Sequence, residues 1–205
     1  MTRLDFDYED YFNELFSTTA VLMWSTHHAA ITFAFYINRL YNKQLMRRDN
    51  ITLHTQQGES LCSVFTQQDN LSHTTYLLVD NPNHMPSSRS SVTFFDKTLL
   101  IMGPDAYEQA HNIYADLGNS TPLPSSDEAH TLLRQAFLDN GVLEYALFDF
   151  SEPDDPQTTY FATPSADPRI RDKQRLFLRK QREYACDLLL ALDAFLPNYE
   201  DETKD

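Results

Sequence analysis

The stretch TTAVLMWSTHHAAITFAFYINRLY, residues 18–41, is the most apolar run of this 205-residue chain, and its period changes near the middle. Residues 18–24 are apolar on both faces, which is typical of a central, buried strand. Residues 27–41 follow a helical spacing, with one continuous stripe at Ala30, Phe33, Ala34, Ile37 and Tyr41. We therefore predict that a strand and the helix that packs back on it organise the fold.

Two further expectations concern this helix. Ser25-Thr26 offers a helix cap, so we expect the helix to begin at about His27. Ile31 and Phe35 widen the apolar stripe, so we expect the helix to be covered on more than one side.

Four segments rich in Val, Ile, Thr, Tyr and Phe follow, at residues 45–54, 60–66, 74–80 and 91–102. Groups of turn-forming residues separate these segments. Short connections between consecutive strands make the neighbours antiparallel. We predict an α+β fold in which helices pack on an antiparallel β-meander sheet, with the helix described above lying across one face.

The second half of the chain predicts more helices and a last strand. Helices are expected at 104–117 and 127–140, and a strand at 142–150. Residues 1–16 alternate acidic and aromatic side chains, which fits an edge strand, a short helix or a docking arm. We divide the chain into an α+β core domain (1–150), a Pro-rich loop (151–168), a long C-terminal helix (169–197) and a disordered acidic tail (198–205).

Composition narrows the class of protein. A formal net charge of −14 argues against broad binding to nucleic acid or to anionic membranes, and the chain's 4 glycines leave little room for a glycine-rich phosphate loop. We expect Cys62 and Cys186 to be reduced, buried thiols of a cytoplasmic protein. We expect no signal peptide in the acidic N-terminal segment, and the longest apolar run is too short and too polar to span a membrane.

Motifs that carry chemistry are weak in this sequence. The adjacent residues His27 and His28 point about 100° apart on a helix, so we expect a capping or surface role for them. The acidic residues in 149–155 fit a solvated loop better than a Mg²⁺ site. Ser25-Thr26-His27 lacks the surroundings of a nucleophile. We therefore predict no catalytic residue, no metal and no cofactor.

The strongest anomaly is electrostatic. Residues 169–182, RIRDKQRLFLRKQR, carry a net charge of +6, so the rest of the chain carries −20, the difference between −14 and +6. A solvated helix face that pairs with the acidic body would explain this, and so would a docking helix for an acidic partner, RNA included. The candidate partner-binding residues are Arg169, Arg171, Lys173, Arg175, Arg179, Lys180 and Arg182.

The order of elements resembles the IPExxxVDY family of Bacteroidetes, small proteins of unassigned function. The similarity lies in the strand and helix that end at Ile37-Asn38, in Arg47-Arg48-Asp49, in the strand 76–81, in FFDKTLLIMG at 94–103 and in the final helix, Gly-Val and strand of 132–150. The IPE half of the motif has no counterpart, the helix at 104–117 is additional, and residues 151–205 lie beyond the similarity. The resemblance implies a cytoplasmic protein of a Bacteroidetes bacterium and transfers no catalytic residue.

The sequence favours a non-catalytic cytoplasmic protein that works through a protein partner or a homodimer. Sevenfold spacing of Leu178, Ala185 and Leu192, together with the segregated charge, makes the C-terminal helix the expected contact surface. One alternative is an enzyme or small-ligand protein with a pocket between the first predicted helix and the sheet. A further alternative is an RNA-associated accessory protein that uses the basic helix.

Overall fold

A single antiparallel sheet forms the centre of the protein in the computed structural model, which describes residues 8–55, 58–81, 95–118, 128–152, 154–161 and 165–196. The strand order is β2-β4-β5-β6-β1-β7-β8, with β3 pairing to β4. The strands are β1 (Thr19–Thr26), β2 (Met46–Arg47), β3 (Ile51–Thr55), β4 (Gly58–Asp69), β5 (Thr74–Asp80), β6 (Lys97–Met102), β7 (Val142–Asp149) and β8 (Gln157–Thr158). The predicted α+β fold with an antiparallel meander and a long C-terminal helix is confirmed.

Strand β1 lies in the middle of the sheet because it pairs with β6 on one side and β7 on the other. Its side chains alternate between the two faces, and those of residues 20–24 are all fully buried. Val21 and Met23 belong to one apolar cluster, and Leu22 and Trp24 to the other. This explains why the strand is apolar on both faces.

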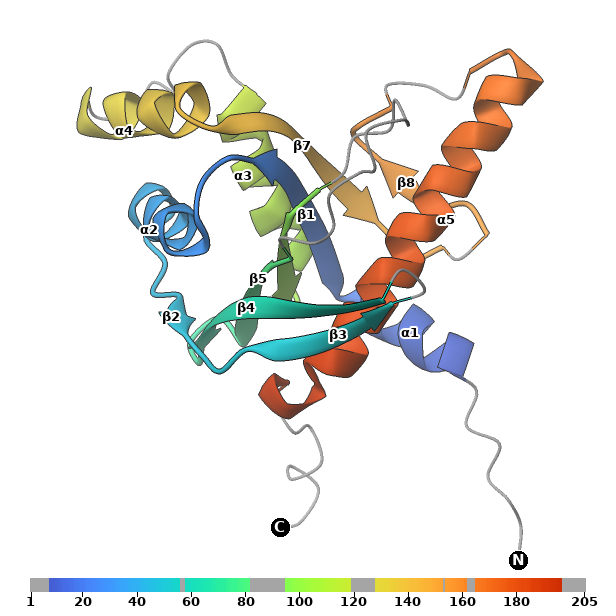
Figure 1. Cartoon of the computed structure of the whole chain (residues 1–205), viewed down its shortest axis with the longest axis horizontal. Coiled ribbons are helices and arrows are strands. Elements are labelled where there is room, and N and C mark those ends of the chain that lie inside the picture. Colours follow the sequence, from blue (N-terminus) through green and yellow to red (C-terminus); the bar gives the residue numbers. More distant parts are fainter. Residues whose placement is uncertain are drawn as a thin grey trace, which may run out of the picture.

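Helices cover both faces of the sheet, giving three layers (Figure 1). Helices α1 (Tyr8–Ser17) and α5 (Pro168–Ala191) cover one face, and α2 (Ala30–Leu40), α3 (Ala106–Gly118) and α4 (Glu128–Asp139) cover the other. Residues 8–17 thus adopt the helical option among those predicted for the N-terminal segment. Helix α5 is a core element as well as a surface helix, since its buried face shares one cluster with the strands.

The predicted start of the helix after β1 is wrong. Strand β1 continues through Ser25 and Thr26, which pair with β7, and α2 begins only at Ala30 without a side-chain cap. Pairing with β7 therefore overrides the local capping preference of Ser-Thr. The expected cover on a second side of α2 is also wrong, since Ile31 is 71% exposed and Phe35 is 50% exposed.

Other boundaries differ by smaller amounts. The predicted strand 45–54 is split into β2 and β3, which pair with successive parts of β4, and Arg48 bridges the gap by donating its N–H to Val64 O at 2.9 Å. The Pro-rich loop contributes the short edge strand β8. Helix α5 ends at Ala191, and a 3₁₀ turn, η1 (Asp193–Phe195), follows it. The predicted tail 198–205 and the first residues, 91–94, of the predicted strand 91–102 lie outside the described residues.

Gly103 is required at the junction of β6 and α3. Its φ is +144°, and a Cβ there would lie 2.6 Å from the backbone oxygen of His73 and 3.2 Å from the Cα of Thr74. We expect Gly103→Ala to lower the free energy of unfolding by about 1–3 kcal/mol from backbone strain, with the clash adding to it. Urea unfolding measures this loss.

Gly58 is the matched control for this substitution. Its φ of +123° is also strained for Ala, but nothing lies within 4 Å of the position that a Cβ would take. Gly58→Ala should therefore cost less than Gly103→Ala, and equal losses would show that the contact with His73 contributes nothing.

Candidate functional site

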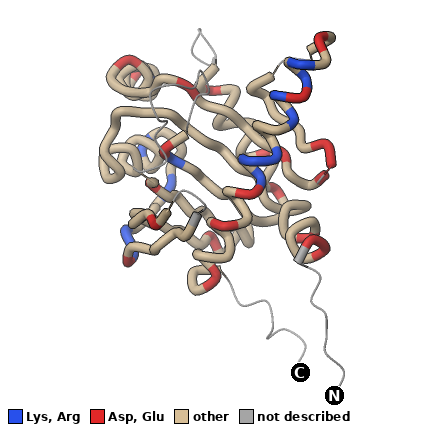
Figure 2. Tube along the Cα trace, turned by 45° about the vertical axis from the view of Figure 1, so that its right-hand side comes forward, with Lys and Arg blue, Asp and Glu red and all other residues tan. Residues whose placement is uncertain are grey.

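The predicted partner-binding residues all lie on α5, on the outer layer of the molecule. Figure 2 shows several Lys and Arg along this helix with a few Asp and Glu among them, and further Asp and Glu scattered over the other elements. Asp167 caps the helix by accepting a hydrogen bond from the N–H of Arg169 at 2.9 Å, with Pro168 at the first position. Six of the seven basic side chains are exposed, namely Arg169, Arg171, Lys173, Arg175, Arg179 and Lys180.

Arg182 differs from the other six because it is engaged within the chain. Its Nη2 donates to Asn13 Oδ1 at 2.7 Å, its Nε donates to Phe150 O at 3.4 Å, and its guanidinium lies 5.5 Å from the centre of the Phe16 ring. These contacts attach α5 to α1 and to the end of β7. Arg182 therefore stabilises the fold, and the surface described below consists of the other six cations.

The residues with sevenfold spacing, on which the predicted contact surface was based, face the sheet. Leu178, Ala185 and Leu192 are buried in the cluster between α5 and the sheet. Leu189 is also buried there. The spacing that resembles a coiled-coil seam is thus used within the chain, because a sheet and a partner helix both select apolar residues on one face of a helix.

The six exposed cations have no acidic partner within the described part of the chain. The ion pairs found between described residues include no basic residue of α5. Pairing of this helix with the acidic body is therefore not seen there.

An aromatic cluster supports the amino-terminal half of α5. Phe177 packs on Tyr160 and Phe161 with ring centroids 5.9 and 5.6 Å apart, and Phe95 and Phe148 join them. The rings of Tyr160, Phe161 and Phe177 are partly buried by one another. They hold the helix in place and offer little free ring face for stacking on a nucleic-acid base.

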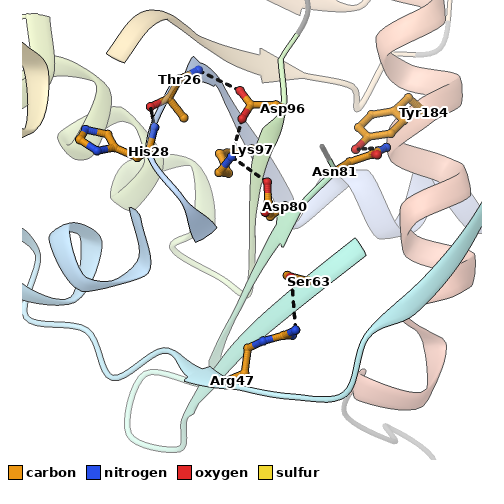
Figure 3. A network of polar contacts seen from close by, with 9 residues as sticks. All are labelled: Thr26, His28, Arg47, Ser63, Asp80, Asn81, Asp96, Lys97 and Tyr184. Atoms are coloured by element: carbon orange, nitrogen blue, oxygen red, sulfur yellow. Dashed lines mark hydrogen bonds and ion pairs between the residues drawn. The ribbon is translucent and has the colours of Figure 1, made fainter. Parts of the chain in front are cut away.

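A second polar feature lies inside the sheet, around Lys97 (Figure 3). The side chain of Lys97 is only 4% exposed, and its Nζ contacts a carboxylate oxygen of Asp96 and lies 2.7 Å from Asp80 Oδ1. Asp80 stands directly opposite Lys97 on β5, and Trp24 stands opposite it on β1. The ion triad therefore connects the end of β5 to the start of β6.

Further hydrogen bonds extend this network. Asp96 Oδ1 accepts the N–H of Thr26 at 2.8 Å, and Thr26 Oγ1 accepts the N–H of His28 at 3.1 Å. On the other face of the sheet Asn81 Nδ2 donates to the hydroxyl of Tyr184 at 3.5 Å, which reaches α5. Burial raises the pKa of Tyr184, so this phenol stays protonated at neutral pH. The network positions β1, β5 and β6 relative to the helices.

The arrangement around Lys97 does not offer the parts of a catalytic centre. The lysine is enclosed between two carboxylates, and within the described ranges no group of three His, Cys, Asp or Glu residues could hold a metal ion. Burial raises the pKa of the Cys62 and Cys186 thiols to about 11, so neither is a thiolate nucleophile at neutral pH. Both cysteines are free.

The other sequence candidates also have structural roles. His27 is exposed, whereas His28 is half-buried: its ring stacks on Phe137 at 5.5 Å, and its Nε2 lies 2.9 Å from Phe137 O in the last turn of α4. Asp149 accepts hydrogen bonds from Ser151 and from the hydroxyl of Tyr107 at 2.8 Å. Ser25 and Thr26 are ladder residues of β1.

The space between α2 and the sheet, where the alternative prediction put a pocket, is occupied by side chains of described residues. Phe33 and Ile37 of α2 are 0% exposed and belong to the same cluster as Trp24. This packing gives no support to a ligand site at that place. A sequence signal for the Lys97 network does exist. Lys97 directly precedes the apolar run TLLIM, and Asp80 directly follows the apolar run TYLLV, so each charge adjoins a segment expected to be buried.

None of the helices within the described ranges combines the length and the apolar composition needed to cross a membrane. No family model, no curated protein and no solved structure matches this chain. Two segments that carry the resemblance to the IPExxxVDY family, those around Asp80 and Asp96, meet at Lys97. Membership of that family stays a prediction.

Proposed function

We propose that this is a non-catalytic cytoplasmic protein that works through contacts with an acidic protein surface, and that the outer face of α5 makes these contacts. The observation that carries the proposal is a group of six exposed cations on one helix of a chain whose net charge is −14. Charges of this kind steer encounter and select partners of opposite sign.

The anchoring of α5 supports this role. Its apolar face is fixed on the sheet and its amino-terminal half is held by the Phe177 cluster, so the cations are presented from a rigid element. A contact surface on a rigid helix loses less conformational entropy on binding than one on a loop. Ile170 and Leu176, at 49% and 54% exposure, add apolar area among the charges.

Matched charge substitutions test the proposal. Lys173→Gln/Arg179→Gln removes two cations from α5, and Arg39→Gln/Arg48→Gln removes two exposed cations elsewhere. We expect the first pair to weaken binding of a fluorescent polyglutamate peptide by about tenfold at low ionic strength, and the second pair to leave it nearly unchanged. Fluorescence anisotropy measures both, and circular dichroism checks that the variants are folded.

A single-stranded RNA oligonucleotide is the comparison ligand in the same assay. Tighter, α5-dependent binding of the RNA than of the peptide would favour the RNA-associated alternative. Equal effects of the two pairs of substitutions on peptide binding would contradict the assignment of the contact surface to α5.

A further inference from the structure

Helix α5 has a second charge asymmetry, along its length. Its exposed face is basic through Lys180, and beyond it the acidic residues Glu183, Asp187 and Asp193 follow. Glu183 and Asp193 are exposed and Asp187 is partly buried. Helix α5 thus carries net positive charge on its first half and acidic residues, Glu183 and Asp187, in its last turns, and Asp193 follows in η1.

Two leucines lie on this same exposed face. Leu176 and Leu190 are 54% and 52% exposed and stand seven residues to either side of Glu183. Residues seven apart fall on nearly the same side of a helix, so Leu176, Glu183 and Leu190 form one outward row. This row is separate from the buried sevenfold row, Leu178, Ala185 and Leu192, on the opposite side.

The acidic residues at the end of α5 form no ion pair within the described residues. Glu183 and Asp187 are one turn apart. Burial, and then the negative charge of Glu183, raise the pKa of Asp187 above its usual value. Two like charges at this spacing repel each other, and a cation from outside the chain would relieve that repulsion.

We propose that the outer face of α5 binds the same face of a second copy of this chain, with the two helices antiparallel and crossing near Glu183. This assignment rests on the proposed function, because it identifies the acidic surface contacted by the α5 cations as the acidic end of α5 in a second copy. In this register Leu176 packs on Leu190 of the second copy, and the contact is repeated by the two-fold symmetry.

Charge complementarity selects this orientation. With Glu183 at the two-fold axis, Arg179 faces Asp187 of the second copy. A parallel pair would instead place the two basic halves together and the two acidic ends together, which is repulsive.

The two Glu183 side chains meet at the centre of the antiparallel pair. Lys180 lies one turn before Glu183 on each helix, so two ammonium groups flank the two carboxylates. The contact involves one helix from each copy, which is a small interface. We therefore expect weak association, in the micromolar range, that is weakened by salt.

The first experiment measures self-association of the full-length chain by sedimentation equilibrium. We expect a monomer–dimer equilibrium at low ionic strength that weakens by about tenfold at high ionic strength. Arg179→Glu and Asp187→Lys should each weaken the dimer, because each places like charges opposite one another. The double variant Arg179→Glu/Asp187→Lys should restore it by exchanging the two partners, and Arg39→Glu on α2 serves as the control that leaves it unchanged.

The second experiment tests the register in a Cys186→Ser background. Leu176 and Leu190 are 14 residues apart, about 21 Å along the helix axis. A mixture of the Leu176→Cys and Leu190→Cys variants should be joined by a short bismaleimide, whereas each variant alone should not. Cross-linking of either variant alone would show a parallel pair and overturn the proposal.

The outcomes separate this inference from the proposed function. A chain that stays monomeric at all concentrations, yet binds polyglutamate through Lys173 and Arg179, would refute the dimer and leave the contact surface standing. The register would also be refuted if both single variants weaken the dimer and the double variant Arg179→Glu/Asp187→Lys does not restore its affinity. This outcome counts only if all three variants are folded. A chain that neither dimerises nor binds the peptide would contradict both.

Discussion

Replacing Lys97 with Met should lower the free energy of unfolding by about 3–5 kcal/mol. The substitution keeps the length of the apolar stem and removes only the ammonium group. Asp80 and Asp96 then remain at their buried positions, with side chains 15% and 10% exposed, without the cation that lies between them. Urea unfolding followed by tryptophan fluorescence measures the loss, since Trp24 stands opposite Lys97 on β1.

Two further variants make this expectation specific to the buried charges. Lys97→Met/Asp80→Asn should be less destabilised than the sum of its single substitutions, because the amide removes one of the two unpaired carboxylates. Lys173→Met, on the exposed face of α5, should change stability by no more than about 0.5 kcal/mol. A loss below about 1 kcal/mol for Lys97→Met would mean that the contacts have the energy of a surface ion pair.

Much of the fold could be predicted from the distribution of the apolar residues along the chain. The strands at the centre and in the meander appear where apolar runs and β-favouring residues indicated them, and the helices α2 to α5 lie where helical spacing did. The misplaced start of α2 has a different origin. Ser25-Thr26 suits both a cap and a strand end, and only the pairing of Ser25 with Glu144, 119 residues away in sequence, decides between them.

The sequence predicted the positive charge of α5, but it did not predict which residues of the helix face the sheet. The basic run of α5 is visible as a local composition change. Sequence cannot reveal that Arg182 contacts Asn13 and Phe16, because these residues lie more than 160 positions away. Nor can it distinguish a sevenfold row that packs on the chain's own sheet from one that packs on a partner, since both bury the same residue types.

Phe33→Ala should be as costly as the loss of Lys97, for a different reason. Phe33 is 0% exposed, and its ring lies 5.2 Å from that of Trp24 and 5.3 Å from that of Phe137. These contacts join β1, α2 and α4, so removing the ring leaves a cavity where three elements meet. We expect a loss of about 3–5 kcal/mol in the free energy of unfolding, measured by urea or thermal unfolding.

Phe35 provides the matched control on the same helix. It lies two residues further on, is 50% exposed and has the guanidinium of Arg39 5.9 Å from its ring centre. Phe35→Ala should therefore change stability by no more than about 0.5 kcal/mol, since the side chain is half in solvent and Ala favours the helix. Two residues correspond to about 200° around a helix, so the two variants report on opposite sides of α2. Equal losses of unfolding free energy for the two variants would mean that α2 is covered on both sides, as the apolar stripe alone suggested. A larger loss for Phe35→Ala would mean that the opposite side of α2 faces the sheet.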